Sequence, residues 1–313
     1  MPTSSSRSYR ALYPEIDLLG LTERQIYPAG DALSPAFLGE CTRELIGVDT
    51  PVASIGSCFA RELKDWLVAR GFNYVQTATG PNARHGSAAW DRVYNTFNLL
   101  QEARRALACF EPSEAYWEVE GVLWDPYRKA VVWRDHAARD AELATHVATA
   151  RRAFMSCDVL IITLGLTEIW YARKDGAVFF QVPPRGVYDP ERHAFRDSSV
   201  GENTENVAAF CGLVQGHNPG VHIILTVSPI PLRATFQPQN VLESDALSKA
   251  KLLVAAREVA RLLPYVEYFP AFEIVKAVVE RPFEADNRHV RREVVEDVMY
   301  AFSQRYMVGG AVT

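Results

Sequence analysis

The chain has 313 residues, of which 48% are hydrophobic and 23% are charged, and its formal net charge is -5. A chain of this length and apolar content can bury a sizeable core as one large domain or two modest ones. A general nucleic-acid binder needs a basic face to neutralise phosphates, so the acidic balance argues against a nucleic-acid partner.

The five cysteines are odd in number and widely spaced, and no two of them form a CxxC pair: Cys41, Cys58, Cys109, Cys157 and Cys211. This pattern suggests neither a disulfide framework nor a zinc site, so we expect no metal. The first twenty residues lack the apolar core of a signal peptide, and no stretch approaches the roughly 20 apolar residues of a membrane span. We therefore expect a cytoplasmic protein with no membrane partner.

The first half of the chain reads as an arm followed by strand, helix and hairpin signals. Residues 1–50 are rich in Pro, Ser and Gly and predict an N-terminal arm. Residues 52–56 are a short apolar run, and residues 60–70 carry apolar side chains at helical spacing before Gly71, a C-cap residue. A turn and a helix are predicted over 90–110. Residues 116–135 alternate aromatic and polar positions around an Asp-Pro-Tyr turn, which predicts a β-hairpin.

The second half alternates helices with apolar strands. A helix over 142–157 runs into a strand over 158–165, and a hairpin-like segment follows at 176–184. Next come a helix over 200–219, with Thr204 and Asn203 as candidate caps, and a buried strand over 221–229. A helix over 244–262, a short strand at 265–268 and a closing helix over 292–307 complete the chain.

This alternation predicts an α/β fold with a doubly wound, mainly parallel sheet, which is a flavodoxin-like three-layer α/β/α arrangement. We expect one catalytic domain over 51–313, preceded by the arm and interrupted by the β-hairpin insertion. A small lid over 111–140 is the alternative reading of that insertion.

Polar residues that can carry chemistry follow the predicted strands. They are Gly56, Ser57 and Cys58 after the first strand, Gly165, Thr167 and Glu168 after the second, Ser228 after the third, and Asp286 and His289 before the last helix. The carboxyl ends of parallel strands meet at one edge of the sheet, so these distant segments can converge there.

The spacing of Asp286 and His289 allows both side chains to lie on one side of a turn that enters a helix. Asp286 could then orient the imidazole, and His289 could act as general base toward a hydroxyl or a thiol. An N-cap aspartate beside an exposed histidine would explain the same spacing. The nucleophile-type turn at residues 56–58 favours the catalytic interpretation.

Six ordered motifs resemble the GSCFA-domain family, which is similar to the SGNH/GDSL hydrolase superfamily. They are GSCFA (56–60), TLGLTEIW (163–170), ILTVSPIPL (224–232), LSKAKL (247–252), YFPAFEIV (268–275) and DNRH (286–289). The resemblance covers roughly residues 50–305. It implies an SGNH-hydrolase-like fold with a nucleophile after the first strand, an oxyanion hole formed by a Gly and an Asn, and an Asp-x-x-His near the C-terminus.

Carried over to this chain, the resemblance implies Asp286 and His289 as the base pair. The usual Gly-x-Asn-Asp lands on residues 165–168, where Thr167 replaces the Asn and a hydroxyl must substitute for the amide. Asn95, or a backbone amide beside it, is the candidate for the missing donor. The superfamily's nucleophile is the second residue after the glycine, which here is Cys58, and Ser57 takes the place of the usual Asp.

Physical chemistry also favours Cys58. A helix N-terminus and a nearby imidazolium stabilise a thiolate, and a thiolate needs less help from a base than a serine does. We therefore predict an acyl-transfer enzyme, either an esterase or thioesterase or an acyltransferase, that acts on a small-molecule acyl donor through an acyl-Cys58 intermediate. The alternatives are a serine esterase that uses Ser57 and an inactive binding module of the same fold, in which Cys58 fills the junction.

Other motifs carry less chemistry. The S-x-x-K pattern of Ser248 and Lys251 lacks the further elements of β-lactamases and is interpreted as accidental. Lys249 could reach an acidic substrate group, but a solvated lysine is the simpler reading. The histidines outside the Asp-x-x-His show no metal-ligand spacing and are expected mostly at the surface or in turns. Neither a GxGxxG nor a P-loop is present, so we expect no nucleotide cofactor.

Overall fold

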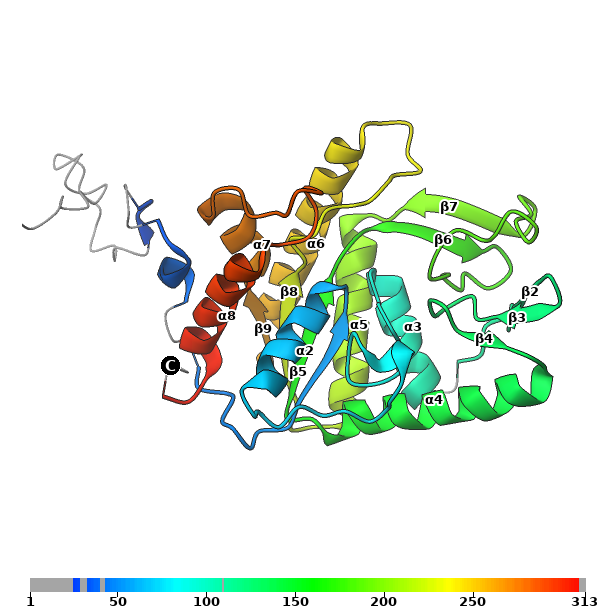
Figure 1. Cartoon of the computed structure of the whole chain (residues 1–313), viewed down its shortest axis with the longest axis horizontal. Coiled ribbons are helices and arrows are strands. Elements are labelled where there is room, and N and C mark those ends of the chain that lie inside the picture. The colour runs from blue at the N-terminus through cyan, green and yellow to red at the C-terminus, as the bar shows by residue number, and fades with distance from the viewer. Residues whose placement is uncertain (1–24, 29–32, 40–42, 109, 310–313) are drawn as a thin grey trace, which may run out of the picture. The chain divides into compact units, whose positions relative to one another are not determined.

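The computed structural model describes residues 25–28, 33–39, 43–108 and 110–309 (Figure 1). The chain divides into two compact units, one of residues 45–269 and one that combines residues 1–44 with residues 270–313. Most of the predicted arm, and both Cys41 and Cys109, lie outside the described residues.

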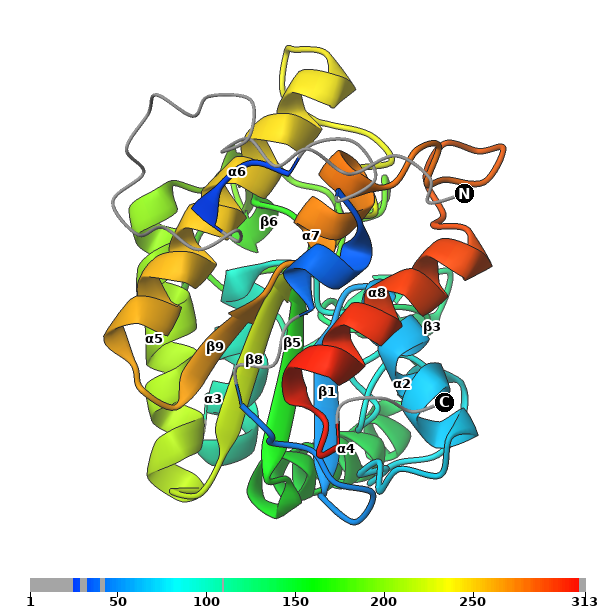
Figure 2. The same cartoon turned by 90° about the vertical axis from the view of Figure 1, so that its left-hand side faces the viewer.

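The unit of residues 45–269 is built on a four-stranded parallel sheet. Its strands lie in the order β1 (Val52–Gly56), β5 (Val159–Leu164), β8 (His222–Val227) and β9 (Val266–Phe269), side by side in Figure 2. Every residue of β1 and β5 is buried. Continuous apolar runs of this kind suit strands that are covered on both faces, which confirms the predicted parallel α/β sheet.

The direction of winding reverses at β1. Tyr74 forms an isolated parallel bridge with Val52 on the edge of β1 that faces away from β5. The chain therefore moves to one side after β1 and to the other side after β5, so the fold is doubly wound. In such sheets ligands bind at the carboxyl ends of the strands where the winding reverses, which here is the space between β1 and β5.

Five long helices cover this sheet: α2 (Phe59–Ala69), α3 (Thr96–Leu107), α4 (His136–Ser156), α5 (Val200–His217) and α6 (Val241–Leu262). Helix α2 packs on β1 and β5, α6 packs on β8 and β9, and α3 packs between α4 and α5. Figure 1 shows α2 on one side of the sheet and α3 and α5 on the other. This gives the three-layer α/β/α arrangement that the sequence predicts.

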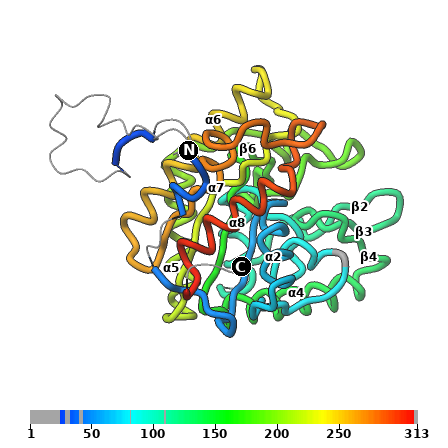
Figure 3. The backbone as a smooth tube through the Cα atoms, turned by 60° about the vertical axis from the view of Figure 1, so that its left-hand side comes forward, coloured from blue at the N-terminus to red at the C-terminus, as the bar shows by residue number. Residues whose placement is uncertain are grey.

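The predicted hairpin over 116–135 is a small antiparallel sheet of three strands: β2 (Trp117–Val119), β3 (Val122–Trp124) and β4 (Val132–Trp133). Its tight turn is at Glu120 and Gly121, which both have positive φ. The Asp-Pro-Tyr segment that we took for the turn instead connects β3 to β4. A separate ribbon pairs β6 (Glu168–Ala172) with β7 (His193–Asp197). Figures 1 and 3 show the β2–β4 sheet at one end of this unit.

Helix α5 starts at Val200 as predicted, but local hydrogen bonds correct the predicted cap. Ser199 is its N-cap and forms a capping box with Glu202, whereas Thr204 and Asn203 lie inside the helix. Helices α4 and α6, by contrast, begin earlier than predicted, at residues 136 and 241, because Asp135 and Asn240 cap them.

Among its described residues, the second unit has the 3-10 helix η3 (Pro35–Leu38), the short helix α7 (Ala271–Glu273), the π segment η5 (Ile274–Val278) and the helix α8 (Arg292–Tyr306). Its core is the buried face of α8, which includes Val298 and Phe302 and packs against η3 and η5. Within the described part of both units, no helix combines the length and the apolar character that a membrane crossing requires.

Candidate active site

The turn after β1 depends on Gly56. Its φ is +148°, and a Cβ placed there would lie 2.4 Å from the carbonyl oxygen of Thr163 on β5. Any side chain at this position would force β1 and β5 apart, so only glycine fits. The chain can therefore turn sharply at the point where the two strands end and present the next two residues above the sheet.

Ser57 faces inward at this turn. Its amide donates to Oγ1 of Thr163 at 2.8 Å, and the two hydroxyl oxygens are 3.0 Å apart. The Ser57 hydroxyl also accepts from the amide of Phe59 at 3.3 Å. Only 2% of the residue is exposed. The Ser57 side chain thus joins the turn to β5 and the start of α2.

Cys58 is the N-cap of α2 and is half-buried. Backbone N–H groups at a helix N-terminus favour a negative charge, and a thiolate is the charged form of this side chain. The structure describes three cysteines, of which Cys157 and Cys211 are buried and Cys58 is partly exposed.

Residues 93 and 94, just before α3, form backbone hydrogen bonds to the ends of both β1 and β5. The Val93 amide donates to the Gly56 carbonyl at 2.7 Å, and the Gly165 amide donates to the Tyr94 carbonyl at 2.7 Å. A Cβ on Gly165 would lie 3.1 Å from that carbonyl and 3.5 Å from Cβ of Ser57. The structure therefore brings together the predicted segments around residues 57, 95 and 165.

Asn95 has a different role from the one we expected. It is the N-cap of α3: its Oδ1 accepts from the amide of Asn98 at 2.8 Å, and its Nδ2 donates to Oδ1 of Asn98 at 2.6 Å. The residue is buried. These contacts orient the Asn95 side chain along its own helix, so its task is to fix the start of α3.

Thr167 is fully buried and lies in a polar cluster between β6, β7 and α6. Its hydroxyl donates to Asp197 at 2.5 Å, and its amide donates to Oγ of Ser248 at 2.8 Å. Lys251 pairs with the same Asp197 carboxylate. The hydroxyl hydrogen is therefore already used, and Thr167 is not presented as an oxyanion donor. Ser248 and Lys251 are structural, as expected for an accidental S-x-x-K match.

The other predicted residues at the carboxyl ends of the strands have mainly structural contacts. Lys249 is 1% exposed, and its ammonium donates to the carbonyls of Gly165 at 2.5 Å and Ile230 at 2.9 Å, so our reading of a solvated lysine was wrong. Ser228 is buried at the end of β8. Glu168 accepts from Thr235 at 2.5 Å and anchors the loop that precedes α6.

Asp286 and His289 form a close pair in the other unit. Nδ1 of His289 lies 2.5 Å from Oδ2 of Asp286, while Oδ1 of Asp286 accepts from the amides of Arg288 and His289. These backbone bonds, followed by the bond to the His289 side chain, lower the pKa of Asp286 to about 2. Because Nδ1–H is directed at a carboxylate, Nε2 is the nitrogen left to accept a proton.

The structure adds a group that we missed beside the β1 turn, composed of His85, Asp91, Arg92 and Tyr94. His85 lies in a turn and is buried. Nε of Arg92 donates to Nε2 of His85 at 3.1 Å, and Nη1 donates to the Tyr94 hydroxyl at 3.3 Å. Burial, and to a smaller degree the nearby Cys58, raise the pKa of Tyr94 against the opposing effect of Arg92. This group therefore lies within electrostatic reach of Cys58.

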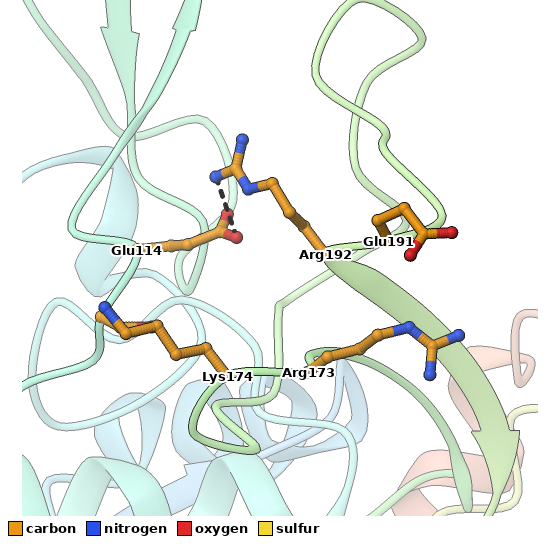
Figure 4. A pocket seen from close by; sticks show the side chains of 6 residues that line it. Glu114, Arg173, Lys174, Glu191 and Arg192 are labelled. Carbon is orange, nitrogen blue, oxygen red and sulfur yellow. Dashed lines mark ion pairs between the residues drawn. The ribbon is translucent and has the colours of Figure 1, made fainter.

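A cavity of about 390 Å³ lies elsewhere in this unit, between the chain before β2 and the ends of β6 and β7 (Figure 4). Glu114 pairs there with Arg192 at 3.0 Å, and Arg173 and Lys174 also line it. None of the predicted site residues lines this cavity. The described ranges contain no group of three or more His, Cys, Asp or Glu side chains that could hold a metal ion.

Comparison with known proteins identifies one family. The model of the GSCFA family matches residues 51–302 of the chain. No curated protein matches it.

Among solved structures, the chain is similar to a carbohydrate esterase family 3 protein from Talaromyces cellulolyticus, with 9% identity and a TM-score of 0.40 over 81% of this chain and 94% of that one. It is also similar to a family 3 carbohydrate esterase from Clostridium thermocellum, with 11% identity and a TM-score of 0.35 over 82% and 94%. A third similar structure is a protein from Streptococcus pneumonia that is provisionally named a platelet activating factor, with 17% identity and a TM-score of 0.31. The match covers 50% of this chain and only 63% of that protein.

Proposed function

The chain belongs to the GSCFA family, and we propose that it is an acyl-transfer enzyme whose nucleophile is the thiolate of Cys58 and whose base is His289, oriented by Asp286. One observation carries the choice of sulfur over oxygen. Ser57 is 2% exposed and its hydroxyl is bonded to Thr163, whereas Cys58 is half-buried at the N-terminus of α2. A substrate can reach the thiol more easily than the hydroxyl.

The reaction that suits these groups has two steps. Nε2 of His289 takes the proton of the Cys58 thiol, and the sulfur attacks the carbonyl carbon of an ester or thioester, which forms a C–S bond and an oxyanion. The oxyanion collapses, the bond to the leaving group breaks, and that group takes the proton from His289. Water, an alcohol or an amine then gives a proton to His289 and attacks the thioester carbonyl. The C–S bond breaks, the acyl group leaves on the new nucleophile, and the Cys58 sulfur takes the proton from His289 to restore the thiol.

The amide of Cys58 is the backbone donor that this proposal assigns to the oxyanion, because it belongs to the turn that presents the nucleophile. The charge state of Asp286 suits its role as well. With a pKa of about 2, the carboxyl is ionised at any pH near neutrality and can stabilise an imidazolium on His289.

Acyl-enzyme trapping tests the proposal. The protein is mixed with 4-nitrophenyl acetate, quenched in acid and mapped by peptide mass. We expect an acetyl adduct on the peptide that contains Cys58, present in Ser57→Ala and absent in Cys58→Ala. His289→Ala should form the adduct at least about 100-fold more slowly, since a general base typically contributes that much or more.

Two outcomes would contradict the proposal. An adduct on Ser57 that survives Cys58→Ala would indicate the serine esterase. Acetylation of the wild type no faster than that of Cys58→Ala would indicate a binding module that has lost turnover.

A further inference from the structure

The proposed acyl transfer leaves an unmet requirement at the Cys58 turn. A tetrahedral intermediate needs two or three preorganised N–H or O–H donors. The Asn95 side chain is bonded to Asn98, and the Thr167 hydroxyl is bonded to Asp197. The side chains that we expected to donate to the oxyanion are therefore bonded to other partners, and of the expected donors only the Cys58 backbone amide remains.

Arg92 has donors to offer in the same place. The amide of the next residue, Val93, is bonded to the carbonyl of Gly56, so the 92–94 segment runs directly beside the turn. Arg92 and Cys58 interact electrostatically, although the interaction with Tyr94 is the larger one. A guanidinium has five N–H groups. Within the described ranges, Nε uses one on His85 and Nη1 uses one on Tyr94, which leaves three without a hydrogen-bond partner.

His85 and Asp91 fix the direction of this guanidinium. Nε2 of His85 accepts from Nε of Arg92, so the ring carries its hydrogen on Nδ1, which faces Oδ1 of Asp91 at 2.9 Å. Both residues are buried, and Asp91 adopts a φ of +52° that is uncommon for a residue with a side chain. His85 here is an acceptor whose Nδ1 lies beside a carboxylate, and the cation that it orients is Arg92.

We propose that Arg92 is the cationic group of this site, which stabilises the Cys58 thiolate and then donates to the oxyanion, and that His85 and Asp91 position it. The oxyanion part rests on the proposed function, whereas the effect on the thiolate does not. Two further charged contacts lie on the neighbouring residues of this unit. Arg61 and Glu62 on the first turn of α2 pair with each other at 3.0 Å, and the carboxylate of Asp91 offsets part of the Arg92 charge.

The test is the rate of Cys58 alkylation by iodoacetamide as a function of pH, followed by peptide mass mapping. Iodoacetamide is neutral, so Arg92 does not attract the reagent itself. Removing a nearby cation raises the pKa of a thiol, because the thiolate loses a stabilising charge. We expect Arg92→Gln to move the midpoint of labelling upward by about one pH unit and to slow labelling about tenfold below the midpoint. Arg84→Gln, which changes an exposed arginine of the same segment, should match the wild type.

Two further variants separate charge from geometry. Arg92→Lys keeps the charge but loses the planar fork, so it should label close to the wild type and acetylate at least about tenfold more slowly with 4-nitrophenyl acetate. His85→Ala should shift the labelling profile in the direction of Arg92→Gln, and His85→Gln, which restores an acceptor for Nε, should return it toward the wild type.

The proposal is overturned if Arg92→Gln and His85→Ala both label Cys58 with the wild-type pH profile. It is also overturned if Arg92→Lys acetylates as fast as the wild type. A different result would refute acyl transfer alone. In that case the wild type forms no acetyl-Cys58, but Arg92→Gln still shifts the labelling profile, so the effect of Arg92 on the thiolate is retained.

Discussion

A buried carboxylate on α3 gives the sharpest stability prediction. Glu102 is 3% exposed, lies 2.9 Å from Nε2 of His146 on α4, and accepts from Arg105 at 3.1 Å. Burial alone would raise the pKa of this carboxyl, but Arg105 and His146 hold it at about 2, below its usual 4.5. Burial and the nearby Arg128 lower the pKa of His146 against the opposing effect of Glu102.

The depressed pKa of Glu102 translates into free energy of unfolding. A shift from 4.5 to about 2 is worth at most about 3 kcal/mol. The carboxylate contributes this stability above about pH 4.5, where the unfolded chain is also ionised, and the contribution is lost as the pH falls toward 2. Glu102→Gln should therefore lower the free energy of unfolding by up to about 3 kcal/mol at pH 7 and by less than half as much at about pH 3.

Urea unfolding followed by tryptophan fluorescence measures both values. Glu118→Gln, at an exposed position of β2, is the matched control and should change the free energy of unfolding by less than about 0.5 kcal/mol at either pH. If Glu102→Gln costs the same at both pH values, the stabilisation does not come from the ionised carboxylate and the reasoning is wrong.

Two further predictions concern the turn after β1 and the thiols. Gly56→Ala should destabilise the protein by several kcal/mol, because its Cβ would meet Thr163. Gly212→Ala, on an open face of α5, is the control and should be neutral or stabilising by up to about 1 kcal/mol. Thermal unfolding of the two variants measures the difference. Burial raises the pKa of the Cys157 thiol to about 12, so iodoacetamide should label Cys58 in the folded protein well before Cys157, and equal rates would contradict the burial argument.

Several features of the fold could be predicted from the sequence because they depend on local patterns. Continuous apolar runs such as residues 159–164 indicate strands that are buried on both faces, and their alternation with helices indicates a parallel sheet. Gly56 could be recognised as a turn residue before any contact was known, because glycine tolerates a positive φ. The Asp-x-x-His spacing likewise predicted the contact between Asp286 and His289, which lie on one short turn.

The tertiary structure decided which side chains remain available for chemistry. Nothing in the local sequence indicates that the Thr167 hydroxyl bonds to Asp197 or that Lys249 is buried, because each partner comes from another part of the chain. A buried polar group must find a partner, and long-range packing determines which one is within reach. For the same reason Ser57 and Cys58, adjacent in the sequence, differ in the structure: Thr163 on the neighbouring strand takes up the hydroxyl, and the thiol stays accessible at the start of α2.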